Sequence, residues 1–582
     1  MLELAGVHAP ILCFDMKANH DLLFDSLVDR GYLTPGMEIL NVFDHYRSAQ
    51  FAPDSSREQV DIDEWATYFS EARGLTTEEV TDSKGRLYGR ITKNAANVIV
   101  YRQGFRSDGS LFFLDASRLD SANKVLNRTL WLIDPQGRSV AAFSNATAFY
   151  RRWLTELSEG QNTTFIFDDK VAATNLRSLD LPNAIKITPI HSNHIKSAGD
   201  PDRGEVDPNR SKIVSESYRW DGLVFLTHEQ REDYARRFGR TNNLFVVPNP
   251  SRRLDSVPET HQRDTTRGVM LGKLVANKNI DAAIEIISVA RESVPDIRLD
   301  VYGEGPLRET LQKKIFDRGL QNNITLKGHE TGASAHFKSS AFSLVTSRYE
   351  GFSLALLESM GSGCPPIAFD FRYGPRTLID SGKTGYLVEN GNVTEAAARV
   401  VAICRYPDLA SRLGENAWIA SADYDDEAIL RQWADVIVQA WNQKDSRHGP
   451  LRGTVTPSSV VRNDDASVTV SGSFSWGDSS TPELLESTTL SVSLTNRLSG
   501  PAVTVPVALD LDREKTAHFS TRLSEAQIGQ AASAPGAGNI TDVHLLFVAH
   551  NLTSRHSIVP ESADHKWAPA ISDKGQVLFY SG

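Results

Sequence analysis

A chain of 582 residues is too long to fold around one hydrophobic core, and its length predicts about three or four domains. Its formal net charge is −11 and it contains no tract of lysines and arginines, which argues against DNA or RNA as a partner. It also lacks a run of about eighteen apolar residues, so no segment is expected to span a bilayer.

The first residues, MLELAGVHAPILCFDMKANH, lack the basic and then apolar stretches of a secretory signal peptide, so we expect a cytoplasmic protein. The three cysteines, Cys13, Cys364 and Cys404, are scattered along the chain. This argues for a reducing compartment and against a disulfide framework or a zinc site.

Residues 80–145 contain runs in which apolar and polar residues alternate. The runs are RLYGRITKNAANVIVYRQGF, SLFFLDAS and NRTLWLIDPQGRSVAAF, and Asp-Gly and Gln-Gly turns separate their strands. Alternation with a period of two, broken by such turns, predicts an antiparallel β insert.

Two later blocks, residues 163–250 and residues 268–423, alternate short β-branched runs with helical segments. The first contains TFIFDD, AIKITPIH, GLVFLT and NLFVVPN; the second contains GVMLGKL, RLDVYGEG, NITLKG, FSLVTS and PPIAFD. Helices are predicted from Ile280 to Val294 and from about Leu307 to Arg318. The pattern predicts an α/β protein with two facing Rossmann-like domains, which bind ligands beyond the carboxyl ends of their strands.

The segment KDSRHGPLRGTVTPSSVVRNDD is rich in proline, glycine and serine, which predicts a linker, and the alternating runs after it predict an all-β, sandwich-like domain. The expected boundaries are 1–50 and 146–257 for the N-terminal Rossmann-like domain, 51–145 for the β insert, 258–443 for the C-terminal Rossmann-like domain, 444–465 for the linker and 466–582 for the accessory β domain.

The stretch SRYEGFSLALLESMGSGCPPIAFD carries two glutamates, Glu350 and Glu358. We expect Glu350 in the turn after a strand and Glu358 two turns into the next helix. Gly351 would allow close backbone approach at the helix N-terminus, where free N–H groups and the helix dipole favour a phosphate. Taken alone, the pattern also fits a strand-to-helix turn with two surface acids.

A second group of candidates lies in GVMLGKLVANKNID, which places Lys273 and Lys278 after a strand. Two cations at the carboxyl end of a strand suit a diphosphate whose charge grows as it leaves. Two solvated lysines fit the same pattern. In VYGEGPLRE, Gly303 and Gly305 fit either close approach of a nucleotide or a plain tight turn.

The segment PIHSNH places His191 at the end of an apolar strand and His194 three residues later. A metal pair would need a third ligand, which the pattern lacks. We therefore expect His191 to reach into the cleft and His194 to have a capping or structural role.

Four motifs follow one another between about Lys186 and Trp441, namely GKL-x3-K, YGEG, YEGFSLALLESM and TGYLV. Through them the chain resembles the retaining GT-B enzymes commonly called glycosyltransferase family 4. It looks most similar to the wall teichoic acid α-glycosyltransferases, which act on poly(glycerol- or ribitol-phosphate). That likeness rests on CFDMKANHDLLFDSLVDRG, EILNVFDHYR, the β insert, IHSNH and FRYGPRTLIDSGKTGYLVENGN.

The resemblance implies a role for each candidate residue. Glu350 and His191 would lie beside the transferred sugar as catalytic residues, with His191 near its 6-hydroxyl. Lys273 would replace the commoner arginine, keeping the charge but losing the two-pronged hydrogen bonding. The diphosphate would be bound by Lys273, Lys278 and the backbone around Phe352, Ser353 and Leu354. The donor ribose would be bound by Glu358. The nucleotide would approach the backbone at Gly303, Gly305 and Gly351.

The implied activity is transfer of a hexose or N-acetylhexosamine from a UDP-sugar to a hydroxyl of a cell-wall polyol-phosphate polymer, with retention of configuration. No metal or cofactor is expected, because two lysines and a helix N-terminus neutralise the departing diphosphate. The alternatives are the same chemistry on a capsule polysaccharide, a glycolipid or a protein, and a non-catalytic partner subunit of a glycosyltransferase complex.

The resemblance further implies that the N-terminal Rossmann-like domain binds the acceptor and the C-terminal one binds the donor. The implied partners are a UDP-sugar, a polyanionic or lipid-linked glycopolymer, the inner face of the plasma membrane as a peripheral contact, and further copies of the chain through the β insert. In the family, a strand and a glycine-rich loop precede the segment matching PILCFDMKANH, whereas this sequence begins at about that point.

Overall fold

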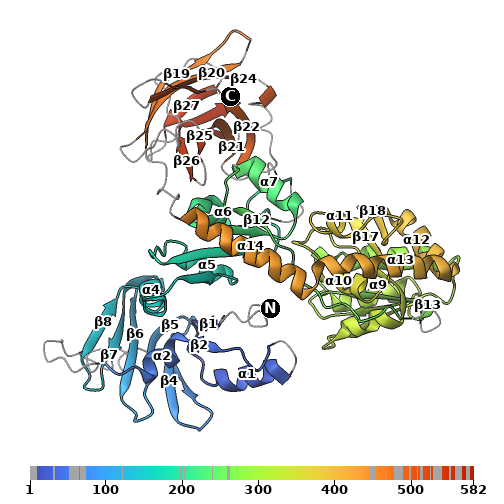
Figure 1. The fold of residues 1–582 in the computed structure, drawn as a ribbon, viewed down its shortest axis with the longest axis horizontal. Coiled ribbons are helices and arrows are strands. Elements are labelled where there is room, and N and C mark those ends of the chain that lie inside the picture. The colour runs from blue at the N-terminus through green and yellow to red at the C-terminus, as the bar shows by residue number, and fades with distance from the viewer. Residues whose placement is uncertain are drawn as a thin grey trace. The chain divides into compact units, whose positions relative to one another are not determined.

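The computed structural model, whose elements are labelled in Figure 1, divides into two compact units. The first consists of Met1–Thr163 and Ser178–Ala184, and the second of Thr164–Arg177 and Ile185–Gly582. The described residues are 9–29, 33–51, 60, 65, 74–120, 122–196, 200–201, 204–238, 240–258, 263–444, 453–465, 467–476, 489–496, 500–507, 509–511, 516–524, 526–527, 540–549, 552–557, 567–571 and 577–581.

The larger parallel sheet of the second unit has six strands in the order β15-β14-β13-β16-β17-β18. Counted from β13, this is the 3-2-1-4-5-6 order of a doubly wound dinucleotide-binding sheet. The strand order reverses between β13 and β16, so their carboxyl ends form the edge at which such sheets bind ligands. The strands are β13 (Asp264–Leu271), β14 (Arg298–Tyr302), β15 (Ile324–Gly328), β16 (Ser340–Val345), β17 (Pro366–Asp370) and β18 (Tyr386–Glu389).

Helices connect these strands, and their apolar residues recur at helical spacing. In α8, Ile280, Ala283, Ile284 and Ile287 are buried, which gives the helix one continuous apolar face. This helix ends at Ala290, earlier than the predicted Val294. The helices are α8 (Ile280–Ala290), α9 (Arg308–Asp317), η5 (Ala333–Ser339), α10 (Leu354–Gly361), α11 (Pro375–Leu378), α12 (Val393–Arg405), α13 (Pro407–Ala420), η6 (Ser421–Tyr424) and α14 (Asp426–Lys444).

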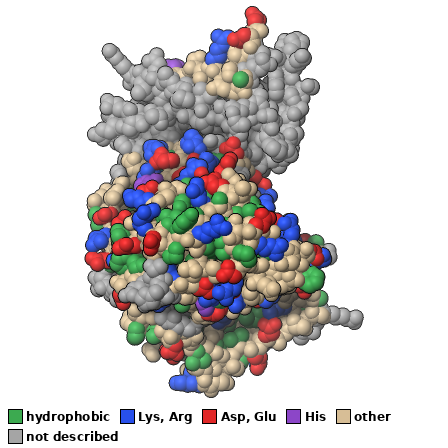
Figure 2. Space-filling view, turned by 90° about the vertical axis from the view of Figure 1, so that its right-hand side faces the viewer, with side chains coloured by type: hydrophobic (Ala, Val, Ile, Leu, Met, Phe, Trp, Pro, Cys, Tyr) green, Lys and Arg blue, Asp and Glu red, His purple; other side chains and the backbone are tan. Residues whose placement is uncertain are grey.

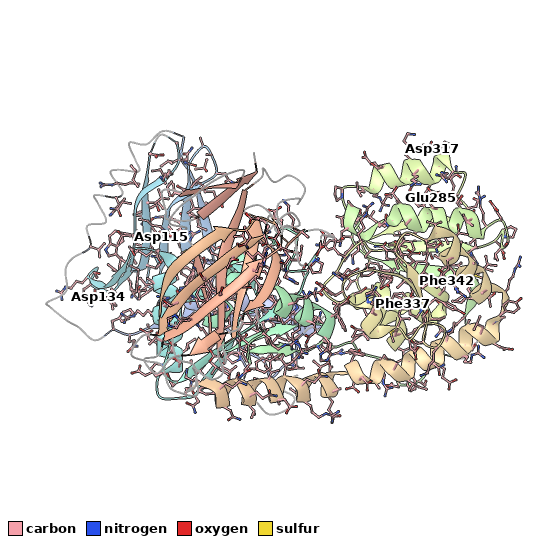
Figure 3. All side chains as sticks on the ribbon, turned by 90° about the horizontal axis from the view of Figure 1, so that it is seen from above. Asp115, Asp134, Glu285, Asp317, Phe337 and Phe342 are labelled. Carbon is pink, nitrogen blue, oxygen red and sulfur yellow. The ribbon has the colours of Figure 1, made fainter. Side chains whose placement is uncertain are left out.

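The two strands at the reversal point pair through a glycine and a phenylalanine. Gly268 of β13 is in register with Phe342 of β16, and Phe342 is fully buried. A Cβ added at Gly268 would lie 2.2 Å from the Phe342 ring, so a side chain there would displace the ring or separate the strands. Figure 3 labels Phe342 and Phe337 in the interior of this domain. The close pairing positions the loops that carry the candidate residues.

A second parallel sheet, in the order β12-β11-β10-β9, precedes the first in the chain. All seven residues of β10 are buried, as expected for a strand covered on both faces. Asp169 caps α5 by accepting hydrogen bonds from the N–H groups of Val171 and Ala172. The elements are β9 (Thr163–Ile166), α5 (Lys170–Leu176), β10 (Ala184–Ile190), α6 (Ser211–Ser215), η2 (Ser217–Arg219), β11 (Gly222–Phe225), α7 (His228–Phe238) and β12 (Leu244–Val246).

The first unit contains a six-stranded antiparallel sheet in which β3 to β8 pair in chain order. Asp134, labelled in Figure 3, organises the β7–β8 turn by accepting from the N–H groups of Gln136 and Arg138. Asp115, also labelled, binds Arg128 through two hydrogen bonds of 2.8 and 2.9 Å across β6 and β7. The elements are β1 (Ile11–Cys13), α1 (His20–Asp29), β2 (Ile39–Asn41), α2 (Val42–Ser48), β3 (Thr76–Thr81), β4 (Leu87–Lys93), β5 (Ile99–Phe105), β6 (Leu111–Leu119), β7 (Val125–Ile133), β8 (Ser139–Phe143) and α4 (Ala146–Ser158).

The end of the chain is built of strands. One sheet has the order β19-β20-β24-β23 and the other the order β22-β21-β25-β28-β27, with β26 paired to β25. The strands are β19 (Gly453–Arg462), β20 (Val468–Trp476), β21 (Thr489–Asn496), β22 (Gly500–Val507), β23 (Leu509–Leu511), β24 (Thr516–Leu523), β25 (Ile540–Ala549), β26 (Leu552–Ser557), β27 (Trp567–Ile571) and β28 (Val577–Ser581).

The predicted linker 444–465 is too long. Strand β19 occupies Gly453–Arg462 and pairs with β20, because its β-branched residues outweigh the proline, glycine and serine around them. Residues 445–452 of the predicted linker lie outside the described residues.

On the surface shown in Figure 2, side chains of lysine and arginine are interspersed with those of aspartate and glutamate, and the hydrophobic side chains form only small groups. The described side chains visible in this view therefore mix charges of both signs. Within the described part of the chain, every helix is too short or too polar to traverse a lipid bilayer.

Candidate active site

The two candidate lysines belong to one loop, which follows the carboxyl end of β13. Lys273 follows Gly272 directly, and Lys278 ends the short 3-10 turn η4 (Ala276–Lys278). The side chain of Lys278 folds back over Gly272, since its Cδ would lie 3.3 Å from a Cβ added there. Both ammonium groups are thereby carried by the loop next to the reversal point of the sheet.

The surroundings of the two ammonium groups differ. Lys278 Nζ donates to Glu350 Oε1 at 2.8 Å, and the two side chains are only 23% and 13% exposed. Lys273 is exposed and forms no ion pair with any described residue. The charge of Lys278 is therefore paired with Glu350, whereas that of Lys273 is unpaired among the described residues.

Glu350 lies in the turn between β16 and α10. Its Oε1 accepts from Lys278 and also from Ser347 Oγ, at 2.6 Å. Both donors bind the same carboxylate oxygen, so the orientation of the side chain is defined while Oε2 can accept from a substrate hydroxyl. Sequence reasoning missed Ser347, although a serine three residues before the glutamate in a turn is a local signal for such a bond.

His191 reaches the same turn from the other parallel sheet of the unit. It follows β10, and its carbonyl oxygen would lie 2.3 Å from a Cβ added at Gly351. Gly351 thus permits close approach of the chain's own backbone. His191 Nε2 lies 2.5 Å from Asp168 Oδ1, and this hydrogen bond lowers the pKa of the Asp168 carboxyl. Asp168 was missed as the partner that orients His191.

Glu358 lies in the second turn of α10, which begins at Leu354, and not two full turns into the helix as predicted. Its carboxyl is half-buried, and burial raises its pKa. It has no hydrogen-bond or ion-pair partner among the residues the structure describes. Such a carboxylate gains stabilisation from any ligand hydroxyl that reaches it.

The N-terminus of α10 holds the three residues predicted to meet a phosphate. Phe352 and Ser353 are buried, and Ser353 has a φ of 81°. Within the described structure the buried Ser353 Oγ lacks a hydrogen-bond partner. Leu354 begins the helix and is 47% exposed. The first N–H groups of a helix have no partner inside it, so this end can donate to an anion.

Gly303 and Gly305 meet the lysine loop. A Cβ added at Gly303 would lie 1.9 Å from the carbonyl oxygen of Gly272, and one at Gly305 would lie 2.4 Å from that of Leu274. The two glycines therefore let the β14 loop pack against the backbone of the β13 loop. Their role in nucleotide approach stays a prediction.

Residues 372–374 contact the backbone of the Glu350 turn and support it. The Glu350 N–H donates to the Arg372 carbonyl, and the Tyr373 N–H donates to the Glu350 carbonyl, both at 2.9 Å. A Cβ at Gly374 would lie 1.8 Å from the Phe352 carbonyl oxygen, which only glycine permits. This segment, FRYGP, contributes to the family resemblance, but no role for it could be predicted from the sequence.

Tyr373 also anchors the segment to α7. Its hydroxyl donates to Asp233 Oδ2 at 2.9 Å, and both residues are buried. His194 stacks on the Tyr373 ring at 6.3 Å between centroids. Burial lowers the pKa of His194 to about 3, so it is a neutral packing residue, which supports the structural role expected for it.

The candidate residues are thus only partly joined. Lys278 and Glu350 are in direct contact, Lys273 shares the loop of Lys278, and His191 abuts the Glu350 turn. Glu358 lies further along α10 and forms no hydrogen bond or ion pair with these side chains.

In the first unit, ligand atoms of Cys13, Asp15 and His20 lie within 4.8 Å of one another. Asp15 Oδ1 and His20 Nε2 are 3.1 Å apart, which is hydrogen-bonding distance. The same spacing would suit a metal ion, but hydrogen bonding is sufficient to account for it.

Comparison with known proteins agrees with the geometry. Residues 252–418, which contain the lysine loop and both glutamates, match the family described as glycosyl transferases group 1. With the two larger parallel sheets, both in its second unit, the protein is a glycosyltransferase with a GT-B fold.

Two relatives are named for polyol-phosphate polymers. The chain is 24% identical over 471 residues to the poly(ribitol-phosphate) alpha-N-acetylglucosaminyltransferase of Staphylococcus aureus (strain COL), covering 74% of this chain and 93% of the relative. It is 27% identical over 251 residues to the poly(glycerol-phosphate) alpha-glucosyltransferase of Bacillus subtilis (strain 168), covering 43% and 37%.

A solved structure supports the fold. A variant of Staphylococcus aureus TarM in complex with fondaparinux, alpha-GlcNAc-glycerol and UDP superposes with a TM-score of 0.56 and 22% identity. The match covers 75% of this chain and 94% of that one.

Proposed function

We propose that the protein transfers a hexose or N-acetylhexosamine from a UDP-sugar to a hydroxyl of a polyol-phosphate polymer of the teichoic acid type, with retention of configuration. The observation that carries the proposal is the Lys278–Glu350 pair at the reversal point of the donor sheet. The polymer is inferred from the two relatives, and retention from the α-linkages in their names, since common UDP-hexoses are themselves α-linked.

In this reaction the acceptor oxygen bonds to C1 of the sugar while the bond from C1 to the diphosphate oxygen breaks. The electron pair leaves with UDP, and the departing phosphate takes the acceptor proton. Lys273 and Lys278 stabilise the charge that develops on the diphosphate, and this effect grows toward the transition state. We propose no metal or cofactor for this step, because the cations are supplied by side chains.

Glu350 and Glu358 have separate roles in this proposal. Glu350, held through Oε1, uses Oε2 to bind hydroxyls of the transferred sugar. Glu358 accepts hydrogen bonds from the donor ribose. His191 lies near the sugar because its backbone contacts the Glu350 turn at Gly351. We place the reaction in the cytoplasm, with peripheral contact to the inner membrane face and self-association through the β insert.

The direct test uses the purified full chain with radiolabelled UDP-sugars and four acceptors: poly(glycerol phosphate), poly(ribitol phosphate), a neutral polysaccharide and a serine-rich peptide. We expect label in a polyol-phosphate polymer, together with an equal amount of released UDP. Label only in the neutral polysaccharide or the peptide would move the acceptor to another class. An absence of transfer from every donor, with UDP still bound, would favour a non-catalytic partner subunit.

The role of Glu350 is tested by Glu350→Gln, which keeps the size of the side chain but removes its charge. We expect kcat to fall by about a hundredfold, while the dissociation constant for UDP changes by less than about threefold. Glu415→Gln, an exposed glutamate of α13, is the matched control. Full activity of Glu350→Gln would contradict the assignment.

A further inference from the structure

A polar cavity of about 460 Å³ lies beside the Glu350 turn. Its lining includes Arg348 and Tyr349, which immediately precede Glu350, together with Arg372, Arg376 and Asn390. All of these residues belong to the second compact unit. The lining holds three arginines but only two acids, Asp200 and Asp370, so its formal charge is +1.

Two of the arginines are already engaged. Arg376 makes two hydrogen bonds to Asp370, at 2.6 and 2.8 Å. Arg372 lies 3.5 Å from Glu229 and 3.4 Å from Asp233, which are separations of loose ion pairs rather than of strong hydrogen bonds. Arg372 can therefore turn toward an anion with little loss, whereas Arg376 is held by its partner.

Arg348 is the third arginine, and its situation is different. It is exposed, and its guanidinium has no hydrogen bond or ion pair with any residue in the described ranges. Its backbone is nevertheless held in place, because its N–H donates to the Asn277 carbonyl at 2.8 Å. A guanidinium on a fixed backbone, two residues from Glu350, is well placed to bind an anion beside the reacting sugar.

We propose that this cavity binds a phosphodiester of the acceptor polymer, through Arg348 with Arg372 as the second cation. This inference rests on the proposed function and adds to it the residues that select a phosphate-containing acceptor. Guanidinium groups bind phosphate oxygens in pairs of parallel hydrogen bonds, which gives direction as well as affinity. In a polyol-phosphate chain each free hydroxyl lies a few bonds from a phosphate, so a bound phosphate positions a neighbouring hydroxyl for transfer.

The test compares Arg348→Ala with Arg412→Ala in the full chain. Arg412 is exposed on α13 and lies outside the cavity lining, and its replacement by alanine removes the same charge as Arg348→Ala. For a poly(glycerol phosphate) acceptor we expect Arg348→Ala to raise the acceptor KM at least about tenfold, and Arg412→Ala to leave it within about twofold. With glycerol as a neutral acceptor, and for the UDP-sugar KM, neither variant should differ from the parent. Arg348→Lys should recover part of the affinity by restoring the charge without the fork.

Two results would overturn the inference. Equal acceptor KM values for Arg348→Ala and Arg412→Ala would show that the cavity does not bind the polymer phosphate. A raised UDP-sugar KM in Arg348→Ala, with the acceptor KM unchanged, would assign the arginine to the donor diphosphate instead.

Calorimetric titration of the protein with poly(glycerol phosphate), in the absence of donor, separates this inference from the proposed function. Binding that Arg348→Ala weakens, combined with no transfer by the parent protein, would refute the proposed function while supporting the phosphate site. Transfer by the parent protein, combined with binding that does not depend on Arg348, would support the proposed function and refute the phosphate site.

Discussion

At the scale of single residues, the site contains two carboxyl groups with different surroundings. Glu350 receives hydrogen bonds from Lys278 and Ser347, both on Oε1, which fix the position of its carboxylate. Glu358 has only burial acting on it, and burial raises its pKa. The proposed chemistry uses Glu350 as a fixed acceptor for sugar hydroxyls, and hydrogen bonds from the ribose would offset the effect of burial on Glu358.

This difference predicts a pH effect on donor binding. In the protein without UDP, burial raises the pKa of Glu358. Part of the protein population therefore carries a protonated Glu358 as the pH falls toward that pKa, and the protonated carboxyl cannot accept two ribose hydrogen bonds. UDP binding should therefore release a proton at mildly acidic pH and weaken as the pH falls. Calorimetry in buffers with different ionisation enthalpies measures the released proton.

Glu358→Gln should abolish the proton release and weaken UDP binding by about tenfold. Glu415→Gln should behave like the parent protein. Undiminished proton release from Glu358→Gln would mean that another group carries the effect.

At the scale of elements, the loop after β16 depends on the segment after β17. Residues 372–374 pair with the backbone of Glu350 and Phe352, and Tyr373 ties this segment to α7 through Asp233. The Glu350 turn is therefore supported by two neighbouring elements of one unit, which limits the positions its carboxylate can take.

Tyr373→Phe should keep the ring stacked on His194 but leave the buried Asp233 without its hydroxyl donor. We expect the free energy of unfolding to fall by about 1–2 kcal/mol in urea titrations. We also expect kcat to fall severalfold with the UDP dissociation constant unchanged, because the turn is less well held. Tyr406→Phe, an exposed tyrosine, should change stability by less than about 0.5 kcal/mol. A kcat equal to that of the parent would show that the anchor does not position Glu350.

At the scale of the molecule, the parallel sheets of the second unit meet at a glycine. Gly351 of the Glu350 turn contacts the backbone of His191 from the other sheet, and a Cβ there would lie 2.3 Å from the His191 carbonyl oxygen. The atom that must move is backbone, so the clash cannot be relieved by a rotamer change.

Gly351→Ala should therefore lower the free energy of unfolding by about 2 kcal/mol or more and reduce kcat. Gly382→Ala is a useful contrast, because nothing lies within 4 Å of its added Cβ. Its φ of 83° is unfavourable for alanine, so any loss of stability there would come from backbone strain and not from a clash. An unfolding free energy for Gly351→Ala equal to that of the parent would show that the two loops separate without cost.

Much of this protein could be predicted from sequence because the relevant signals are local. The alternation of β-branched runs with helical segments predicts parallel sheets, and lysines or glutamates just after such runs must lie at the carboxyl ends of strands. The order of the sheet then brings the β13 and β16 loops together. Local composition was a poor guide for residues 453–462, where strand pairing prevailed over a linker-like sequence.

Only the tertiary structure decides how these residues are used. Lys273 and Lys278 are the same residue type in one loop, yet only Lys278 pairs with Glu350, because the 3-10 turn folds its side chain back. The Tyr373–Asp233 bond joins residues 140 positions apart, and no local pattern reports it. The sequence determines which chemical groups lie at the ends of the strands, since strand and turn propensities act over a few residues. Their pairings depend on packing between distant segments, which only the folded chain defines.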